Sequence, residues 1–173
     1  MDTFIEKIVS RKKGAREGLI ASGIVIGAIA VFFIFQMLTA MFGINLGSIG
    51  LFLGVGIIYL AYRLIIGLNV EFEYVVTNGD IDIDKIIARR NRKRIFSGSC
   101  KDFDIVARVS SSGFEEAIRN AKVKIDATSM SGSDSAFYVT LNYKGERTIV
   151  IFEPDERMLA NFRTFIPRKV LTN

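Results

Sequence analysis

The chain has 173 residues, a formal net charge of +5, a single cysteine and no histidine. Without histidine it lacks the commonest general base and the commonest metal ligand, which excludes Ser-His-Asp, Cys-His and zinc arrangements. We therefore expect a protein that is not an enzyme and that uses no cofactor or metal. The lone Cys100 can form no disulfide within the chain.

The most informative feature is the absence of charged side chains between Gly18 and Tyr62. As a helix this stretch would extend roughly 67 Å at about 1.5 Å per residue, enough to cross a hydrocarbon core of about 30 Å twice. Glycines and polar residues interrupt it over residues 43–50. We predict a transmembrane helical hairpin over residues 19–68, with spans near Leu19 to Phe42 and near Leu46 to Ile66.

Cations flank this predicted hairpin on one side only, while its connecting turn carries no charge. The positive-inside rule then predicts a multi-pass protein of the cell membrane with both termini in the cytoplasm. A cleaved signal peptide fits less well, because its apolar region would be only about 7 to 15 residues long. The flanking cations are Lys7, Arg11, Lys12, Lys13, Arg16 and Arg63.

The predicted hairpin has the composition of an anchor rather than of a transport path, since it holds no acidic or basic side chain. In an antiparallel hairpin Gln36, its most polar residue, would lie level with about Gly56 and serve as structural glue. Two glycine pairs have the spacing of close helix packing and could each seat a bulky side chain of the other helix or of another copy. The predicted packing residues are Gly23, Gly27, Gln36, Gly50, Gly54 and Gly56.

Residues 1–18 form a basic flank before the first span. Phe4, Ile5, Ile8 and Val9 fall on one face of a helix, with the cations elsewhere. This pattern predicts a short helix lying in the headgroup layer, and a frayed terminus explains the same residues equally well.

From Val70 onward apolar residues alternate with polar ones, and Asn78-Gly79 supplies a tight hairpin turn, as in a mainly-β domain. We predict a cytoplasmic domain over residues 70–173 with about seven antiparallel strands. After the two strands joined by Asn78-Gly79, the further strands are expected at Arg92 to Ser97, Asp102 to Val109, Lys122 to Thr128, Ala136 to Lys144 and Arg147 to Phe152.

Two helical segments accompany these strands. Phe114 to Arg119 forms one or two turns within the longest link. A C-terminal helix follows Glu153-Pro154-Asp155-Glu156, where proline at the first helical position and nearby acids favour a helix start, and Pro167 ends it. Its apolar stripe, which we assign to core packing, is Met158, Leu159, Phe162, Phe165 and Ile166.

Seven antiparallel strands and a C-terminal helix resemble the pleckstrin-homology-like (PH-like) split barrel. The segments Tyr74-Val75-Val76-Thr77-Asn78-Gly79 and Asp84-Lys85-Ile86-Ile87-Ala88-Arg89 are similar to those of an uncharacterised family of small bacterial membrane proteins. In that family two transmembrane helices precede a PH-like domain. The resemblance implies a module that binds membranes, peptides or proteins, and it implies no catalytic residue. Another small antiparallel barrel is the alternative fold.

A basic cluster follows the second predicted strand. Because the first strand leads away from the membrane, the second must return, which brings the cluster to the lipid surface as a site for anionic headgroups. The predicted lipid-binding residues are Arg89, Arg90, Arg92, Lys93 and Arg94. Continued alternation would bring the 108–124 link and the 144–147 turn to the same basic edge, opposite an acidic edge that includes residues 80–82, Asp134 and residues 153–156.

Other uses of these charged residues remain open. The basic cluster could be a solvated turn that only reinforces topology, and a nucleic-acid site is disfavoured because no aromatic residues accompany it. The alternating Asp80, Asp82 and Asp84 fit a solvent-facing strand better than a calcium site, which needs more oxygen ligands than they supply. The loop over residues 129–135 is a binding-loop candidate on the exposed rim.

The sequence thus predicts a membrane-anchored, non-enzymatic interaction module that binds a protein partner, anionic lipid headgroups, or both, at the cytoplasmic face. The expected partners are the lipid bilayer and another protein, with homo-oligomerisation possible and no nucleic acid. The alternative hypothesis is an accessory subunit of a membrane transporter or channel, in which the hairpin performs the specific function.

Overall fold

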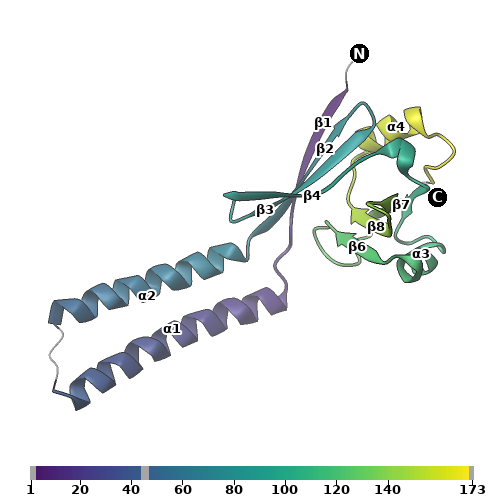
Figure 1. The fold of residues 1–173 in the computed structure, drawn as a ribbon. Helices are drawn as coiled ribbons and strands as arrows, with labels where there is room; N and C mark the ends of the chain where they lie inside the picture. The colour runs from purple at the N-terminus through teal and green to yellow at the C-terminus, as the bar shows by residue number, and fades with distance from the viewer. Residues whose placement is uncertain (1–2, 44–46, 172–173) are drawn as a thin grey trace. The chain divides into compact units, whose positions relative to one another are not determined.

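A computed structural model describes residues 3–43 and 47–171 and divides the chain into two compact units. One unit is Lys13–Asn69, and the other combines Met1–Lys12 with Val70–Asn173. The elements are β1 (Phe4–Ser10), α1 (Ala15–Met41), α2 (Gly47–Gly67), β2 (Val70–Thr77), β3 (Asp80–Ile87), β4 (Asn91–Ser99), a short 3₁₀ helix (Cys100–Asp102), β5 (Ile105–Arg108), α3 (Phe114–Asn120), β6 (Val123–Asp126), β7 (Phe137–Tyr143), β8 (Glu146–Phe152) and α4 (Glu156–Phe165) (Figure 1).

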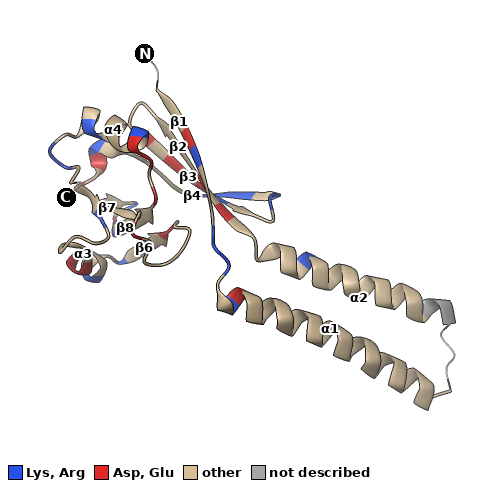
Figure 2. Ribbon diagram, turned by 180° about the vertical axis from the view of Figure 1, so that it is seen from behind, with Lys and Arg blue, Asp and Glu red and all other residues tan. Residues whose placement is uncertain are grey.

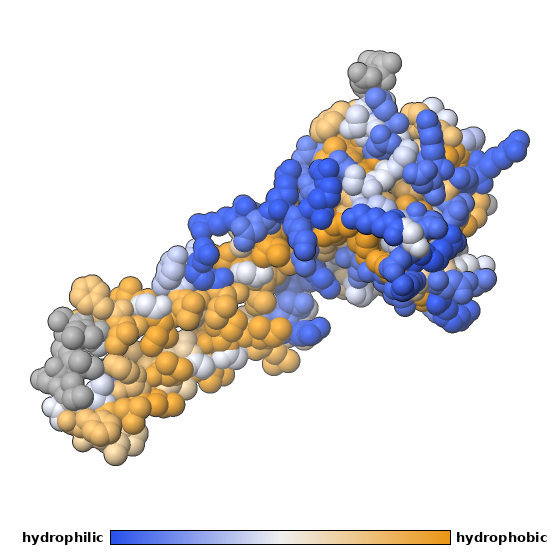
Figure 3. All heavy atoms as spheres, viewed as in Figure 1, coloured by the Kyte–Doolittle hydropathy of each residue, from blue (hydrophilic) through white to orange (hydrophobic). Residues whose placement is uncertain are grey.

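The first unit is the predicted pair of apolar helices. α1 contains no buried residue, and apolar side chains cover the visible surface of both helices (Figure 3). Both helices are long and apolar enough to cross a membrane. α1 ends at Met41 with Phe42 as its C-cap, and the following Gly43 has a φ of 64°, the left-handed conformation common after a helix. The interruption predicted over residues 43–50 includes residues 44–46, which lie outside the described residues.

The helix predicted for the N-terminal flank is wrong, because residues 4–10 form the strand β1. Ile5 and Val9 are buried, whereas Phe4 and Ile8 are exposed. Their spacing fits one face of a helix, but in a strand they divide between its two faces, and pairing with β2, far away in sequence, selects the strand. The mainly-β unit therefore includes the N-terminal residues, and the helical hairpin is inserted between two of its strands.

Eight strands form two four-stranded sheets in the described chain. Sheet A has the order β1-β2-β3-β4, and sheet B has the order β5-β7-β8-β6. Asn78 and Gly79, with φ of 51° and 88°, form the predicted turn between β2 and β3. The prediction that all strands are antiparallel is wrong for one pair, because β6 runs parallel to β8. β6 and β7 flank β8 on opposite sides, and only β7 joins β8 through a hairpin.

The core lies between the two sheets and α4, and Tyr74 connects its parts. Its ring packs edge-on against Phe152, with centroids 5.8 Å apart, while its hydroxyl donates to the Ala127 carbonyl and accepts from the Glu153 amide at 3.3 Å. Burial raises the pKa of Tyr74, so it remains a neutral donor. The remaining large, fully buried aromatic residues are Phe72, Phe96, Phe103, Tyr138, Phe152 and Phe162.

α4 covers the core with the predicted apolar stripe, but it starts later than predicted. Asp155 caps its first turn by accepting from the Met158 amide at 2.8 Å. Pro154 therefore precedes the cap instead of occupying the first helical position. Met158, Leu159, Phe162 and Ile166 are buried, as core packing requires, whereas the assignment of Phe165 to the core is wrong, because its side chain is 38% exposed.

The strand register brings three connections to one end of sheet A. Ser10 lies opposite Glu71, Val70 opposite Ile87, and Ile87 opposite Asn91. We call this the anchor end, because both connections to the helical hairpin start there. The turn that joins β3 to β4 lies at this end, as predicted from the direction of the strands.

Sheet B does not follow the predicted alternation. Arg108 lies opposite Phe137, whereas Tyr143 lies opposite Glu146, so the link after β5 begins at one end of the sheet and the 144–147 turn lies at the other. The link returns along the sheet through α3. The loop over residues 129–135, predicted on the edge opposite the basic cluster, instead begins beside the anchor end, where the Lys12 amide donates to the Ser129 carbonyl at 2.8 Å.

The insertion of the hairpin between paired strands predicts that it can be removed without unfolding the β domain. The Arg11 amide donates to the Val70 carbonyl at 2.9 Å, so replacing residues 13–69 by Asn-Gly leaves a short hairpin loop. This turn-linked protein should be water-soluble and folded. Residues 70–173 alone should be less stable by about 3–6 kcal/mol in urea denaturation, because they lose the burial of Ile5 and Val9. Equal stability of the two proteins would contradict this topology.

Candidate functional site

Charged side chains concentrate on the face of sheet A that points away from the core, which we call the outer face. Strand alternation produces it, since the buried Phe72, Tyr74, Ile81 and Ile83 point to the other side. The charged side chains that β1 to β3 contribute to this face are all acidic, and those that β4 contributes are arginines. These outer-face residues are Glu6, Glu71, Glu73, Asp80, Asp82, Asp84, Arg92 and Arg94.

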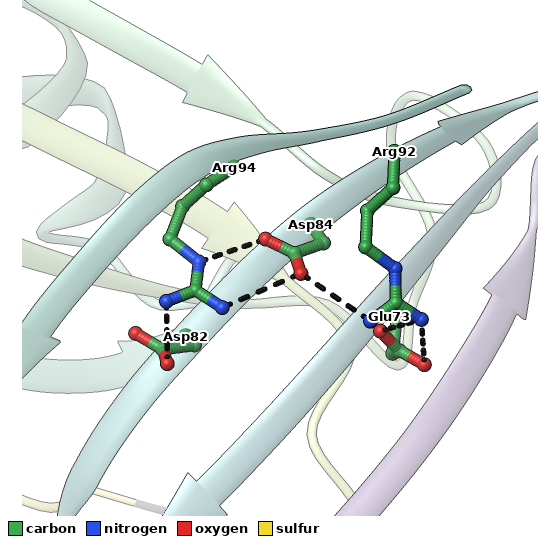
Figure 4. Close-up of polar contacts among 5 residues, drawn as sticks. All are labelled: Glu73, Asp82, Asp84, Arg92 and Arg94. Atoms are coloured by element: carbon green, nitrogen blue, oxygen red, sulfur yellow. Dashed lines mark hydrogen bonds and ion pairs between the residues drawn. The ribbon is translucent and has the colours of Figure 1, made fainter.

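Five of these residues form a network of ion pairs (Figure 4). Asp84 lies between two arginines: its Oδ1 is 2.9 Å from Arg94 Nε, and its Oδ2 is 3.8 Å from Arg92 Nη1. Arg94 also contacts Asp82 at 2.9 Å, and Arg92 contacts Glu73 at 2.7 Å. Glu73 and Asp84 are only 5% and 4% exposed, so these two carboxylates are buried, whereas the side chains of their arginine partners stay about half exposed.

A β-bulge creates this network. The register changes between Ile83, which lies opposite Phe96, and Asp84, which lies opposite Arg94, so Ile95 is an extra residue in β4. Without the bulge Asp84 would lie opposite Ile95, and the arginines would point to the other face of the strand. The one-residue shift therefore places both arginines over the carboxylates.

The network favours the charged form of Arg94, whereas the surroundings of Glu73 disfavour its charged form. The hydrogen bond to Asp84 raises the pKa of Arg94 further, so this residue stays a cation. Burial raises the pKa of Glu73, Arg92 opposes that effect, and the carboxylates of Glu6 and Asp84 add to it. A hydrogen bond between the Glu6 and Glu73 side chains also raises the pKa of Glu73, and Glu6 makes no ion pair within the described part of the chain.

The five predicted lipid-binding residues occupy two different environments. Arg92 and Arg94 belong to the network, and Arg89 contacts Glu71 at 3.2 Å. Arg90 and Lys93 are exposed and make no ion pair within the described part of the chain. The structure therefore assigns internal carboxylates to three of the five cations.

The turn that carries these cations is tight. Ala88 and Arg89 both have a φ of 54°, and the Arg90 amide donates to the Ile87 carbonyl at 3.1 Å. Two successive non-glycine residues in the left-handed region cost roughly 1–2 kcal/mol each. Ala88 and Arg89 are thus the central residues of this strained turn, and Arg90 follows them directly.

Sequence reasoning missed Lys85 as a member of this basic group. Lys85 lies opposite Lys93 in the β3–β4 register, on the face that does not carry the arginines, and it has no ion pair among the described residues. Strand alternation across the turn was the signal for this pair. The basic segment that precedes α1 also begins at the anchor end, at Arg11 and Lys12 (Figure 2).

The predicted packing residues of the helical hairpin are only partly brought together. A Cβ built on Gly54 would lie 3.0 Å from Phe32 Cε2, and one built on Gly50 would lie 3.4 Å from Gln36 Oε1. Gln36 therefore lies beside Gly50, and the prediction that it lies level with about Gly56 is wrong. Gly54 does seat a bulky side chain, as predicted. Built Cβ atoms on Gly23, Gly27 and Gly56 have no neighbour within 4 Å.

Within residues 3–43 and 47–171, no group of three or more acidic, histidine or cysteine side chains is arranged to hold a metal ion. Asp82 and Asp84, two of the three alternating aspartates, contact arginines. Burial raises the pKa of the Cys100 thiol, which disfavours the reactive thiolate.

Residues 1–172 match a family model described as Bacterial PH-like domain (DUF6106). The chain belongs to this bacterial PH-like family. The match starts at the N-terminus and therefore includes β1 and the helical hairpin, in agreement with the resemblance drawn from the sequence. Neither the curated proteins nor the solved structures contain a match to the chain. PH-like domains are typically non-catalytic binding modules, and the ion-pair network and basic turn lie on such a domain.

The two buried carboxylates of this PH-like domain should respond differently to neutralisation. Because the folded-state pKa of Glu73 is raised above 4.5, its contribution to stability falls as the pH rises through that folded value. Glu73→Gln should therefore reduce the loss of stability above pH 4.5. Asp84→Asn should cost about 1–3 kcal/mol at neutral pH, because it weakens two arginine contacts. Urea denaturation of the turn-linked protein across pH measures both, and unchanged pH dependence in Glu73→Gln would refute the assignment.

Proposed function

We propose that this protein is a membrane-anchored, non-enzymatic interaction module that binds anionic lipid headgroups and a protein partner at the cytoplasmic face. The exposure of the apolar helices is the observation that carries the proposal. Leu19 and Leu51 are each 74% exposed, and no residue of α1 is buried. The core helix of a soluble protein would be mostly buried. In a membrane, lipid would instead cover the exposed apolar side chains of both helices on all sides.

The positions of the cations support a cytoplasmic domain. Lys12 and Lys13 precede α1, and Arg63 lies near the end of α2, while α1 carries no charge after Glu17. The positive-inside rule assigns such flanks to the cytoplasm. Because β1 and β2 meet the hairpin at the same end of sheet A, the β domain lies on that same side of the membrane.

The lipid contact is assigned to the cations that have no carboxylate partner. Only Leu68 and Asn69 separate α2 from β2, so the anchor end is tethered within about 11 Å of the end of α2 at 3.8 Å per residue. Lys85, Arg90 and Lys93 lie on the β3–β4 hairpin at this end. Each cation near an anionic leaflet contributes roughly 1 kcal/mol, enough for a few of them to orient a tethered domain.

The hairpin itself is assigned the role of an anchor. The contacts of Gln36 with Gly50 and of Phe32 with Gly54 join α1 to α2, which is the role of polar and small residues within a helix pair. This internal use supports partner binding through the β domain over an accessory-subunit role of the hairpin.

Paramagnetic relaxation tests the lipid contact in the full chain. In nanodiscs doped with a headgroup nitroxide, the amides of residues 88–91 should relax faster in anionic than in zwitterionic lipid, and the difference should disappear at high salt. Arg90→Gln with Lys93→Gln should abolish the difference. The matched control removes two exposed cations elsewhere, Arg119→Gln with Lys124→Gln, and should preserve it. Equal relaxation in both lipids, or equal loss in both variants, would contradict the proposal.

A further inference from the structure

β1 is an open edge of sheet A. Among the described strands it pairs only with β2. The Arg11 amide donates to the Val70 carbonyl and the Asn78 amide donates to the Thr3 carbonyl, so the odd-numbered residues of β1 are those hydrogen-bonded to β2. In an antiparallel ladder the alternate residues then direct their N–H and C=O groups outward. Phe4, Glu6 and Ile8 therefore present a row of unused backbone donors and acceptors.

The side chains of these same residues lie on the outer face. Phe4 is 65% exposed and Ile8 is 54% exposed, with the exposed Glu6 between them. β1 contains no proline and no bulge, which are common devices that protect edge strands. Its only lysine, Lys7, points to the other side and donates to the Glu153 carbonyl at 2.7 Å. The edge thus carries two exposed apolar side chains and one acidic side chain, and neither a proline nor a bulge blocks the pairing of a further strand.

The charge of the outer face is compensated on one edge only. Arg92 and Arg94 lie on β4 and neutralise the acids of β2 and β3 from that side. Glu6 lies on the opposite edge, and its carboxylate contributes to the raised pKa of Glu73. A cation on a strand beyond β1 would lie directly across from Glu6 and complete the charge balance of the face.

We infer that the open edge of β1 binds an extended segment of a different protein, which adds an antiparallel strand with a basic residue opposite Glu6 and apolar residues opposite Phe4 and Ile8. The partner thus carries the pattern apolar-x-basic-x-apolar. Backbone pairing supplies affinity, and the alternate side chains supply selectivity. The inference rests on the proposed function in that it names the chemistry of its protein partner, and it requires no lipid contact.

A second copy of the chain fits this edge poorly. Two-fold antiparallel pairing of β1 with itself keeps the outer face on one side only if the pairing is centred on a residue. The pairing that uses all of β1 is centred on Lys7 and sets two lysines opposite each other, and a shift to Glu6 sets two glutamates opposite each other. Like charges directly opposite destabilise a strand pair. The register centred on Ile8 avoids them but pairs only residues 6–10 of β1 and leaves Phe4 outside the paired part of the strand, so a different segment is the better occupant.

Designed peptides test the inference with the full chain in zwitterionic nanodiscs. The probes are fluorescein-labelled, end-blocked Thr-Ile-Thr-Lys-Thr-Ile-Thr and its counterpart with Glu in place of Lys, and empty nanodiscs correct for lipid binding. Fluorescence anisotropy should show that the Lys peptide binds about tenfold tighter than the Glu peptide. Glu6→Lys should reverse this preference. No binding of either peptide up to about 1 mM would overturn the inference.

A proline variant separates edge pairing from side-chain contact. Ile8→Pro removes one outward N–H and no bond to β2, a substitution that edge strands tolerate, and it should abolish binding of both peptides. Ile8→Thr keeps the backbone donor and should weaken binding only in part. Slow exchange of the Ile5 amide confirms that Ile8→Pro keeps β1 in place. Unchanged binding by Ile8→Pro, or an unchanged preference in Glu6→Lys, would overturn the inference. The relaxation experiment on residues 88–91, which compares anionic with zwitterionic nanodiscs, reports the lipid contact separately.

Discussion

The antiparallel pairing of β1 with β2 is the interaction on which the rest of this structure depends. It joins residues separated in sequence by the whole helical hairpin, from Phe4 opposite Thr77 to Ser10 opposite Glu71. The hairpin is therefore an insertion within a folded domain, and both of its ends are held at one end of sheet A.

Sheet A contains two groups of charged residues: some pair with one another within the sheet, and others remain for external binding. The bulge at Asp84 directs two arginines onto buried carboxylates, which stabilises the β3–β4 hairpin and removes those cations from external binding. Lys85, Arg90 and Lys93 remain available at the anchor end, and Glu6 remains at the β1 edge. In our account these three cations contact lipid, and the β1 edge contacts a protein.

The sequence predicted the elements that depend on local pattern. The apolar helices, the Asn78-Gly79 turn and the apolar stripe of α4 each follow from neighbouring residues. The features that it did not predict depend on contacts distant in sequence. β1 needs β2 to select strand over helix, and the direction of β6 depends on which side of β8 it joins. The pairing of Arg92 and Arg94 with acids depends on one extra residue in β4, which no local periodicity reveals.

Amide hydrogen exchange along β1 in the full chain, reconstituted in nanodiscs and followed by NMR, tests the central claim most directly. The account predicts an alternating pattern, in which Ile5, Lys7 and Val9 exchange slowly because they bond to β2, while Glu6 and Ile8 exchange quickly. Rapid exchange throughout residues 4–10, or uniform protection of consecutive amides as in a helix, would contradict it.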